Sequence, residues 1–133
     1  MNLGSEFRLE AGASEEVIQR LLSEIGCDLP HDYLTFMRTS NGGEGFIGKE
    51  YLRIWKIEDV ATWSKDYVRH TPFEETDELL LFGGNGGGEA FGFDWVANGA
   101  IVEAPMIGME RQYLLHCADT FSEFLKNPTG FKE

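Results

Sequence analysis

Residues 89–105, EAFGFDWVANGAIVEAP, decide the fold that we expect for this chain. Asn98-Gly99 is a strong signal for a two-residue turn between strands. The runs on either side of this turn, Glu89 to Ala97 and Ala100 to Pro105, are rich in apolar, strand-forming residues. We therefore predict an antiparallel hairpin whose two strands lie in a larger sheet.

The register of this hairpin follows from the turn. If Ala97 faces Ala100, one face of the hairpin is continuously apolar, because side chains alternate between faces along a strand. The other face then pairs Asp94 with Glu103. We expect both carboxylates to face water, where like charges across a strand pair cost only about a few tenths of a kcal/mol.

Helical and strand periodicities elsewhere in the chain complete the expected architecture. Helices are predicted over Ser14 to Ile25, Pro30 to Met37, Ile57 to Val68 and Ala118 to Leu125, the last capped by Asp119, with strands over 45–48, 51–55 and 78–82. This order predicts an α+β fold, a single domain with a central, mostly antiparallel sheet packed by N-terminal, middle and C-terminal helices. The domain is expected over residues 14–127. An N-terminal segment, 1–13, would form a strand or be partly disordered, and 128–133 would be a C-terminal tail.

Charge and composition exclude several classes of function. The 133 residues contain 11 Lys and Arg against 23 Asp and Glu, a formal charge of −12. Such a chain is repelled by nucleic-acid phosphates and by anionic membranes, so neither is expected as a partner. The hydrophobic content of 42% is enough for one core. The sequence shows no run of about eighteen apolar residues and no signal-peptide pattern, so we expect a cytoplasmic protein.

A run of glycines from Gly83 to Gly88 follows the strand predicted at 78–82 and has the spacing of a phosphate-binding loop. Such a loop needs Lys and then Ser or Thr after its last glycine, whereas Glu89 and Ala90 stand there. A carboxylate at that point would repel phosphate. The run is therefore predicted to be a structural turn between two sheet strands.

The sequence contains no pattern typical of a metal site or of catalysis. His31, His70 and His116 lack zinc-site spacing, and Cys27 and Cys117 lie far apart, so we expect these cysteines to be reduced and buried. Two nearby carboxylates could act as a general acid and base, but no nucleophile accompanies the predicted carboxylate pair. We expect neither a cofactor nor enzymatic activity.

The negative charge is concentrated in one stretch. Between Arg69 and Arg111 there is no Lys or Arg, and eight acidic residues lie there. Seven of these are the candidate contacts for a basic protein partner: Glu74, Glu75, Asp77, Glu78, Glu89, Asp94 and Glu103. Such a surface steers a basic protein by charge complementarity. Solubility alone is the competing explanation for the charge.

Several motifs together resemble a known family, the SUKH superfamily of the Smi/Knr type. They are Leu29-Pro30-x-Asp32-Tyr33-x-x-Phe36-Met37, Asn41-Gly42-Gly43, Tyr51-Leu52-x-Ile54-Trp55, Ile57-Glu58-Asp59-Val60, Leu80-Leu81-Phe82-Gly83, Glu89-Ala90-Phe91-Gly92-Phe93-Asp94 and Phe121-x-x-Phe124-Leu125. Each motif alone is degenerate, but their order and spacing extend over nearly the whole chain, from Ser14 to Leu125.

The resemblance implies an α+β domain and, for bacterial members, a role as an immunity protein. Such proteins bind and neutralise toxins, many of which degrade or deaminate nucleic acids. Fungal members are regulators with long flanking regions; we expect none for this chain, which favours the bacterial type. No contact residue transfers by position, because the family has diverged to fit different toxins.

Charge and resemblance lead to one hypothesis. The protein would be a non-enzymatic binding module whose acidic face occupies the basic, substrate-binding surface of a toxin. The alternative is a regulatory or small-ligand-binding domain in which the glycine loop and the aromatics Trp55, Phe91 and Trp95 line a pocket. The sequence leaves the identity of the toxin and the state of self-association open.

Overall fold

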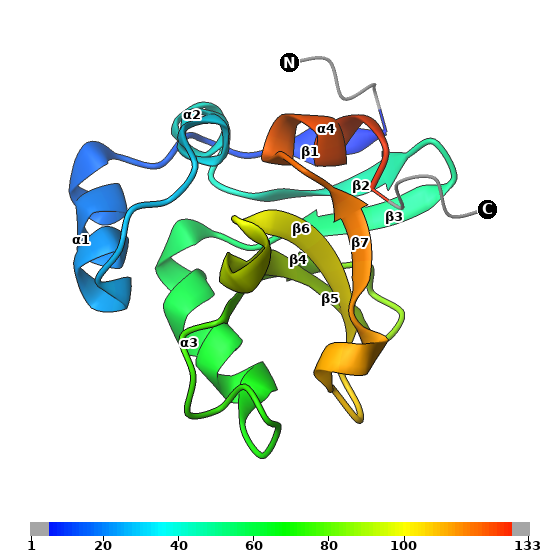
Figure 1. Cartoon of the computed structure of the whole chain (residues 1–133). Helices are drawn as coiled ribbons and strands as arrows, with labels where there is room; N and C mark the ends of the chain where they lie inside the picture. Colours follow the sequence, from blue (N-terminus) through cyan, green and yellow to red (C-terminus); the bar gives the residue numbers. More distant parts are fainter. Residues whose placement is uncertain (1–5, 129–133) are drawn as a thin grey trace.

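A computed structural model describes residues 6–128 and consists of one antiparallel sheet with helices packed against it (Figure 1). The sheet has seven strands that neighbour one another in chain order. The strands are β1 (Phe7–Leu9), β2 (Gly43–Ile47), β3 (Glu50–Ile54), β4 (Leu79–Gly84), β5 (Glu89–Asp94), β6 (Ala100–Pro105) and β7 (Leu115–Ala118). The helices are α1 (Glu15–Ile25), α2 (His31–Thr39), α3 (Ile57–Val68) and α4 (Phe121–Lys126), and two 3-10 turns are η1 (Trp95–Ala97) and η2 (Arg111–Tyr113).

This architecture confirms the predicted α+β fold, a single domain with a central antiparallel sheet. β1 lies within the predicted N-terminal segment, 1–13, whose first five residues are outside the described range. Of the predicted tail, residues 129–133 are also outside it. Within residues 6–128 no helix is long and apolar enough to cross a membrane.

The first and third helices begin and end where their local signals indicate. The Ser14 hydroxyl caps α1 by accepting a hydrogen bond from the Val17 N–H at 3.3 Å. Gly26 ends α1 in the left-handed conformation, with φ 71°, and its N–H donates to the Leu22 carbonyl at 2.9 Å. α3 spans Ile57–Val68 as its periodicity predicts.

The last helix begins later than its sequence suggests. Residues Leu115–Ala118 form β7, which pairs with β6, so the chain remains extended through Ala118. Thr120 caps α4 by accepting a hydrogen bond from the Glu123 N–H at 3.2 Å. The predicted start at Ala118 with Asp119 as cap was therefore wrong; the Asp119 carboxylate instead contacts His116 Nε2 at 2.8 Å.

An aromatic core joins α2, α4 and the middle of the sheet. The Tyr33 ring lies within 5.8 Å, between centroids, of each of three phenylalanine rings: Phe82, Phe93 and Phe121. Tyr33 is fully buried, and its hydroxyl has no hydrogen-bond partner among the described residues. Burial without such a partner makes this hydroxyl an unfavourable part of an otherwise apolar core.

Candidate protein-binding surface

The seven carboxylates predicted to bind a partner separate into three groups. The groups are Glu74, Glu75 and Asp77, then Glu78 and Asp94, and then Glu89 and Glu103. The first group is exposed in the loop between α3 and β4. Both members of the second bind Arg111, and both members of the third line a shallow hollow next to β7.

Asp94 is part of a buried ion pair, with only 4% of the residue exposed. Arg111 Nη1 donates to Asp94 Oδ2 at 3.0 Å, and Arg111 Nη2 donates to Asp94 Oδ1 at 3.2 Å. The same Nη2 donates to Glu78 Oε1 at 2.8 Å. These hydrogen bonds, that to Asp94 above all, raise the pKa of the Arg111 guanidinium. The predicted exposure of Asp94 was wrong, because a cation from outside the acidic stretch reaches it.

The hairpin register also differs from the predicted one. Residues Trp95–Ala97 form η1 instead of continuing the strand, because the Asp94 carboxylate accepts a hydrogen bond from the Val96 N–H at 3.2 Å. β5 therefore ends at Asp94, which pairs with Ala100.

The predicted pairing of Asp94 with Glu103 was accordingly wrong. Glu103 lies opposite Phe91 in the sheet, three residues before Asp94. Because side chains alternate along a strand, Asp94 and Glu103 are on opposite faces of the hairpin. Glu103 is also buried, at 7% exposed, and does not face water as predicted.

The glycine run is a turn between β4 and β5, as its sequence predicts. The Asn85 Oδ1 accepts hydrogen bonds from the N–H groups of Gly87 at 2.8 Å and Glu89 at 3.2 Å, and its Nδ2 donates to Glu89 Oε1 at 2.7 Å. At Gly83 an added Cβ would lie 2.2 Å from the Arg53 carbonyl oxygen, so the approach of β3 requires glycine there. The run thus has a structural role in the sheet, and the side chain of Asn85 binds the amide groups of Gly87 and of Glu89, the residue after the run.

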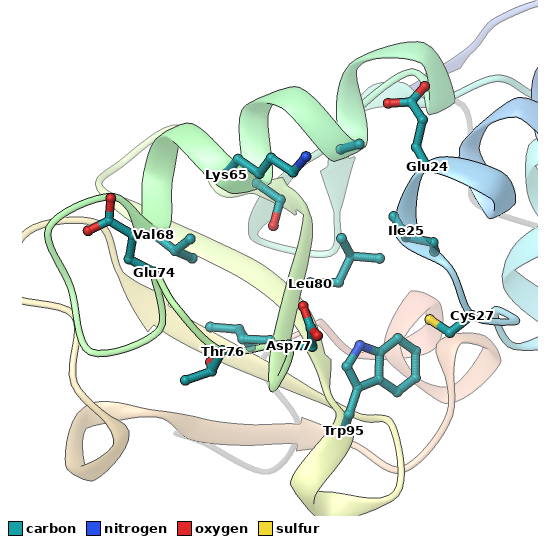
Figure 2. A pocket seen from close by; sticks show the side chains of 13 residues that line it. Glu24, Ile25, Cys27, Lys65, Val68, Glu74, Thr76, Asp77, Leu80 and Trp95 are labelled. Atoms are coloured by element: carbon teal, nitrogen blue, oxygen red, sulfur yellow. The ribbon is translucent and has the colours of Figure 1, made fainter.

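A pocket of about 270 Å³ opens beside the exposed acidic loop. Its walls come from the end of α1, from α3, from the loop before β4 and from Trp95, which is half-buried. Figure 2 shows the Trp95 ring with Asp77 on one side and Cys27 on the other. Three carboxylates line the pocket against one cation: Glu24, Glu74 and Asp77 against Lys65.

The thiol of Cys27 responds to one of these carboxylates, Asp77, and to Asp28, which does not line the pocket. Partial burial raises the pKa of Cys27, and the charges of Asp28 and Asp77 raise it further. This response indicates a negative potential at the pocket wall. Cys27 is exposed, so the prediction that both cysteines are buried was wrong for it, whereas Cys117 is buried; neither forms a disulfide.

The aromatics required by the ligand-binding alternative do not come together. Trp95 lines the acidic pocket, Trp55 lines other hollows, next to Arg53, and Phe91 is buried at 2% exposed. The partners of Trp55 are instead Tyr67, stacked at 5.5 Å, and Trp63, edge-on at 5.4 Å between centroids.

The aromatic face of α3 was missed in the sequence. The spacing of Val60, Trp63 and Tyr67 indicates a helix; in the structure only Val60 is fully buried, and the two aromatics are each 39% exposed. A helical period identifies residues that share a face but does not say how far the cover over that face extends.

The histidines show no sign of a metal site. Over residues 6–128, no group of three or more His, Cys, Asp or Glu side chains is placed to hold a metal ion.

The chain matches the model of a known family. The model of the SMI1 / KNR4 family (SUKH-1) matches residues 12–127, which include every helix and every strand from β2 to β7, and the acidic pocket. No curated protein matches the chain.

Proposed function

Because the chain belongs to the SMI1 / KNR4 family (SUKH-1), we propose that it is an immunity protein: a non-enzymatic, acidic binding module that binds and neutralises a cognate bacterial toxin of the nuclease or deaminase type. The observation that carries this proposal is the acidic pocket, the site lined by Glu24, Glu74, Asp77 and Trp95. It combines excess negative charge with an accessible aromatic ring, which solubility alone does not require.

The charge of this surface suits a toxin that acts on nucleic acid. Such an enzyme presents Lys and Arg to the phosphates of its substrate. An acidic protein that covers the same residues competes with the substrate electrostatically, and long-range attraction speeds the encounter. The partner is therefore a basic protein.

The pocket itself fits a single cationic side chain. A lysine or arginine that enters it would meet the carboxylates of Glu74 and Asp77 and could lie against the face of Trp95. Trp and Arg are frequent at the energetic centres of protein interfaces. The pocket would thus contribute to the lifetime of the complex.

The remaining carboxylates have other roles in this proposal. Glu75 is exposed in the same loop but does not line the pocket, so it contributes to steering. Glu78 and Asp94 hold Arg111, and we assign them to stability instead of contact.

Co-expression tests the function directly. The genes beside this one are searched for a large secreted protein, whose C-terminal domain is the candidate toxin. We expect the protein to restore growth to cells that produce the toxin domain and to co-purify with it as a complex. Continued toxicity, with no complex between the two purified proteins, would contradict the proposal.

Matched variants test the pocket within that complex. Glu74→Gln with Asp77→Asn removes two pocket charges and preserves the shape of the side chains, including the oxygen that accepts the His70 N–H. We expect the dissociation rate to rise about tenfold or more, as for the loss of a charged hydrogen bond. The control Glu75→Gln lies in the same loop and should change mainly the association rate.

A further inference from the structure

A second surface feature lies apart from the acidic pocket, at the end of the sheet where β6 leads through η2 into β7 (Figure 1). It is a shallow hollow of about 450 Å³. Its apolar lining comes from Pro105, Ile107, Tyr113 and Leu115, and its carboxylates are Glu89 and Glu103.

The apolar side chains of this hollow are unusually accessible. Ile107 is 93% exposed, Tyr113 is 52% exposed and Leu115 is 45% exposed. Single exposed apolar side chains are common on protein surfaces, but several that converge on one hollow indicate a binding surface.

The charge of the hollow selects the kind of partner. Among residues 6–128 no Lys or Arg lines it, whereas the carboxylates of Glu89 and Glu103 do. The nearest cation along the chain, Arg111, is bound by Asp94 and Glu78, and its guanidinium lies 5.5 Å from the centre of the Phe73 ring. The hollow therefore complements a segment that carries positive charge next to an apolar side chain.

We propose that this hollow, next to β7, docks a segment of a protein partner in which lysine or arginine adjoins an apolar side chain. The apolar side chain lies against Ile107, Tyr113 and Leu115, and the cation meets Glu89, the more accessible of the two carboxylates. The inference rests on the proposed function in taking the partner to be the toxin, and it adds a second contact region to the acidic pocket.

Peptide binding to the whole protein tests this surface without the toxin. The probe is a synthetic pentapeptide of alternating lysine and leucine, added up to millimolar concentration while backbone amide resonances are followed by NMR. We expect the shifts to concentrate at Gly108, Tyr113 and Leu115. Ile107→Ser with Leu115→Ser should weaken binding at least about fivefold, and Glu89→Gln should do the same.

Matched controls separate this site from non-specific binding. Val96→Ser removes an apolar side chain that is 63% exposed on η1, outside the hollow, and should leave binding unchanged. Thermal unfolding of each variant shows whether the fold is intact. The single variant Ile107→Ser changes a side chain that is almost fully exposed, so it should affect stability least.

Four results would overturn the inference. The first two are an absence of resonance shifts and shifts that centre on the acidic pocket. The third is equal binding of a pentapeptide with serine in place of lysine. The fourth is resonance shifts that depend on protein concentration without peptide, which would assign the hollow to a second copy of this chain. Peptide binding at the hollow without protection against the toxin would instead refute the proposed function and leave this site standing.

Discussion

The loop at residues 74–77 and the carboxylate of Asp94 come from the same acidic stretch, yet the fold gives them opposite surroundings. Glu74, Glu75 and Asp77 are exposed around the acidic pocket. Asp94 is buried against Arg111, which lies seventeen residues further along the chain. The comparison teaches that a carboxylate in a cation-free segment is available to a partner only where no cation from elsewhere in the fold reaches it.

The largest difference between the two regions should be in stability. Asp94→Asn removes the charge of a buried group and leaves Arg111 without its main partner, so we expect the free energy of unfolding to fall by about 2–3 kcal/mol. The partial exposure of Arg111, 45% for its side chain, keeps the loss below that of a fully buried pair. Urea denaturation measures the loss. Glu75→Gln is the control, and its free energy of unfolding should stay within about 0.5 kcal/mol of the wild-type value. Equal losses of stability in both variants would contradict the difference between the exposed loop and the buried ion pair.

A smaller effect of the opposite sign is expected from the buried polar group that lacks a partner. The Tyr33 hydroxyl is buried without a hydrogen bond, in contrast to Asp94. Tyr33→Phe should therefore raise the free energy of unfolding, by about 1 kcal/mol. A loss of stability would mean that this hydroxyl has a partner in solution, such as a buried water molecule.

The same tyrosine gives the stability a dependence on pH. Burial raises the pKa of Tyr33 well above its usual value near 10, so the folded protein retains the phenolic proton to higher pH than the unfolded chain. Stability is therefore unaffected by this group below pH ~10 and falls as pH rises above it. Urea denaturation between neutral and alkaline pH should show a shallower fall for Tyr33→Phe, and identical slopes would contradict the assignment.

The smallest effect concerns the field in the acidic pocket. Because Asp77 contributes to the raised pKa of Cys27, Asp77→Asn should lower that pKa and move the pH profile of Cys27 alkylation to lower pH. Asp94→Asn is the matched control, since its charge is not among the causes of the shift. Cys117 is buried and should react slowly. If the pH profile of Cys27 alkylation moved equally in both variants, the charge of Asp94 would act on Cys27 as strongly as the charge of Asp77.

Local signals were enough to predict much of the fold. Ser14 and Gly26 mark the ends of α1 through their own hydrogen bonds and backbone angles, and α3 follows from one apolar period. These features depend on residues that are close in sequence. Asn98 and Gly99 both have positive φ, 58° and 80°, but they end a connection over residues 95–99, so the predicted two-residue turn was wrong.

The predictions that failed concern features in which a side chain competes with the strand for backbone hydrogen bonds, or which depend on contacts between residues far apart in sequence. The Asp94 side chain caps η1 and so shortens β5, which changed the register that the turn alone suggests. β7 is four residues long, too short for a clear strand pattern, and its Leu115 and His116 are exposed. The acidic pocket requires α1, α3 and Trp95 to meet, and no local pattern predicts that meeting.

The most direct test of the central claim is the salt dependence of association between this protein and the toxin domain that it protects against in co-expression. Stopped-flow measurements would compare the wild type with the triple variant Glu74→Gln, Glu75→Gln and Asp77→Asn. We expect the wild-type association rate to fall steeply with ionic strength, and the variant to associate about tenfold more slowly at low salt with a weaker dependence. Identical rates and salt dependences for the two proteins would contradict the claim that the exposed acidic loop recognises a basic partner.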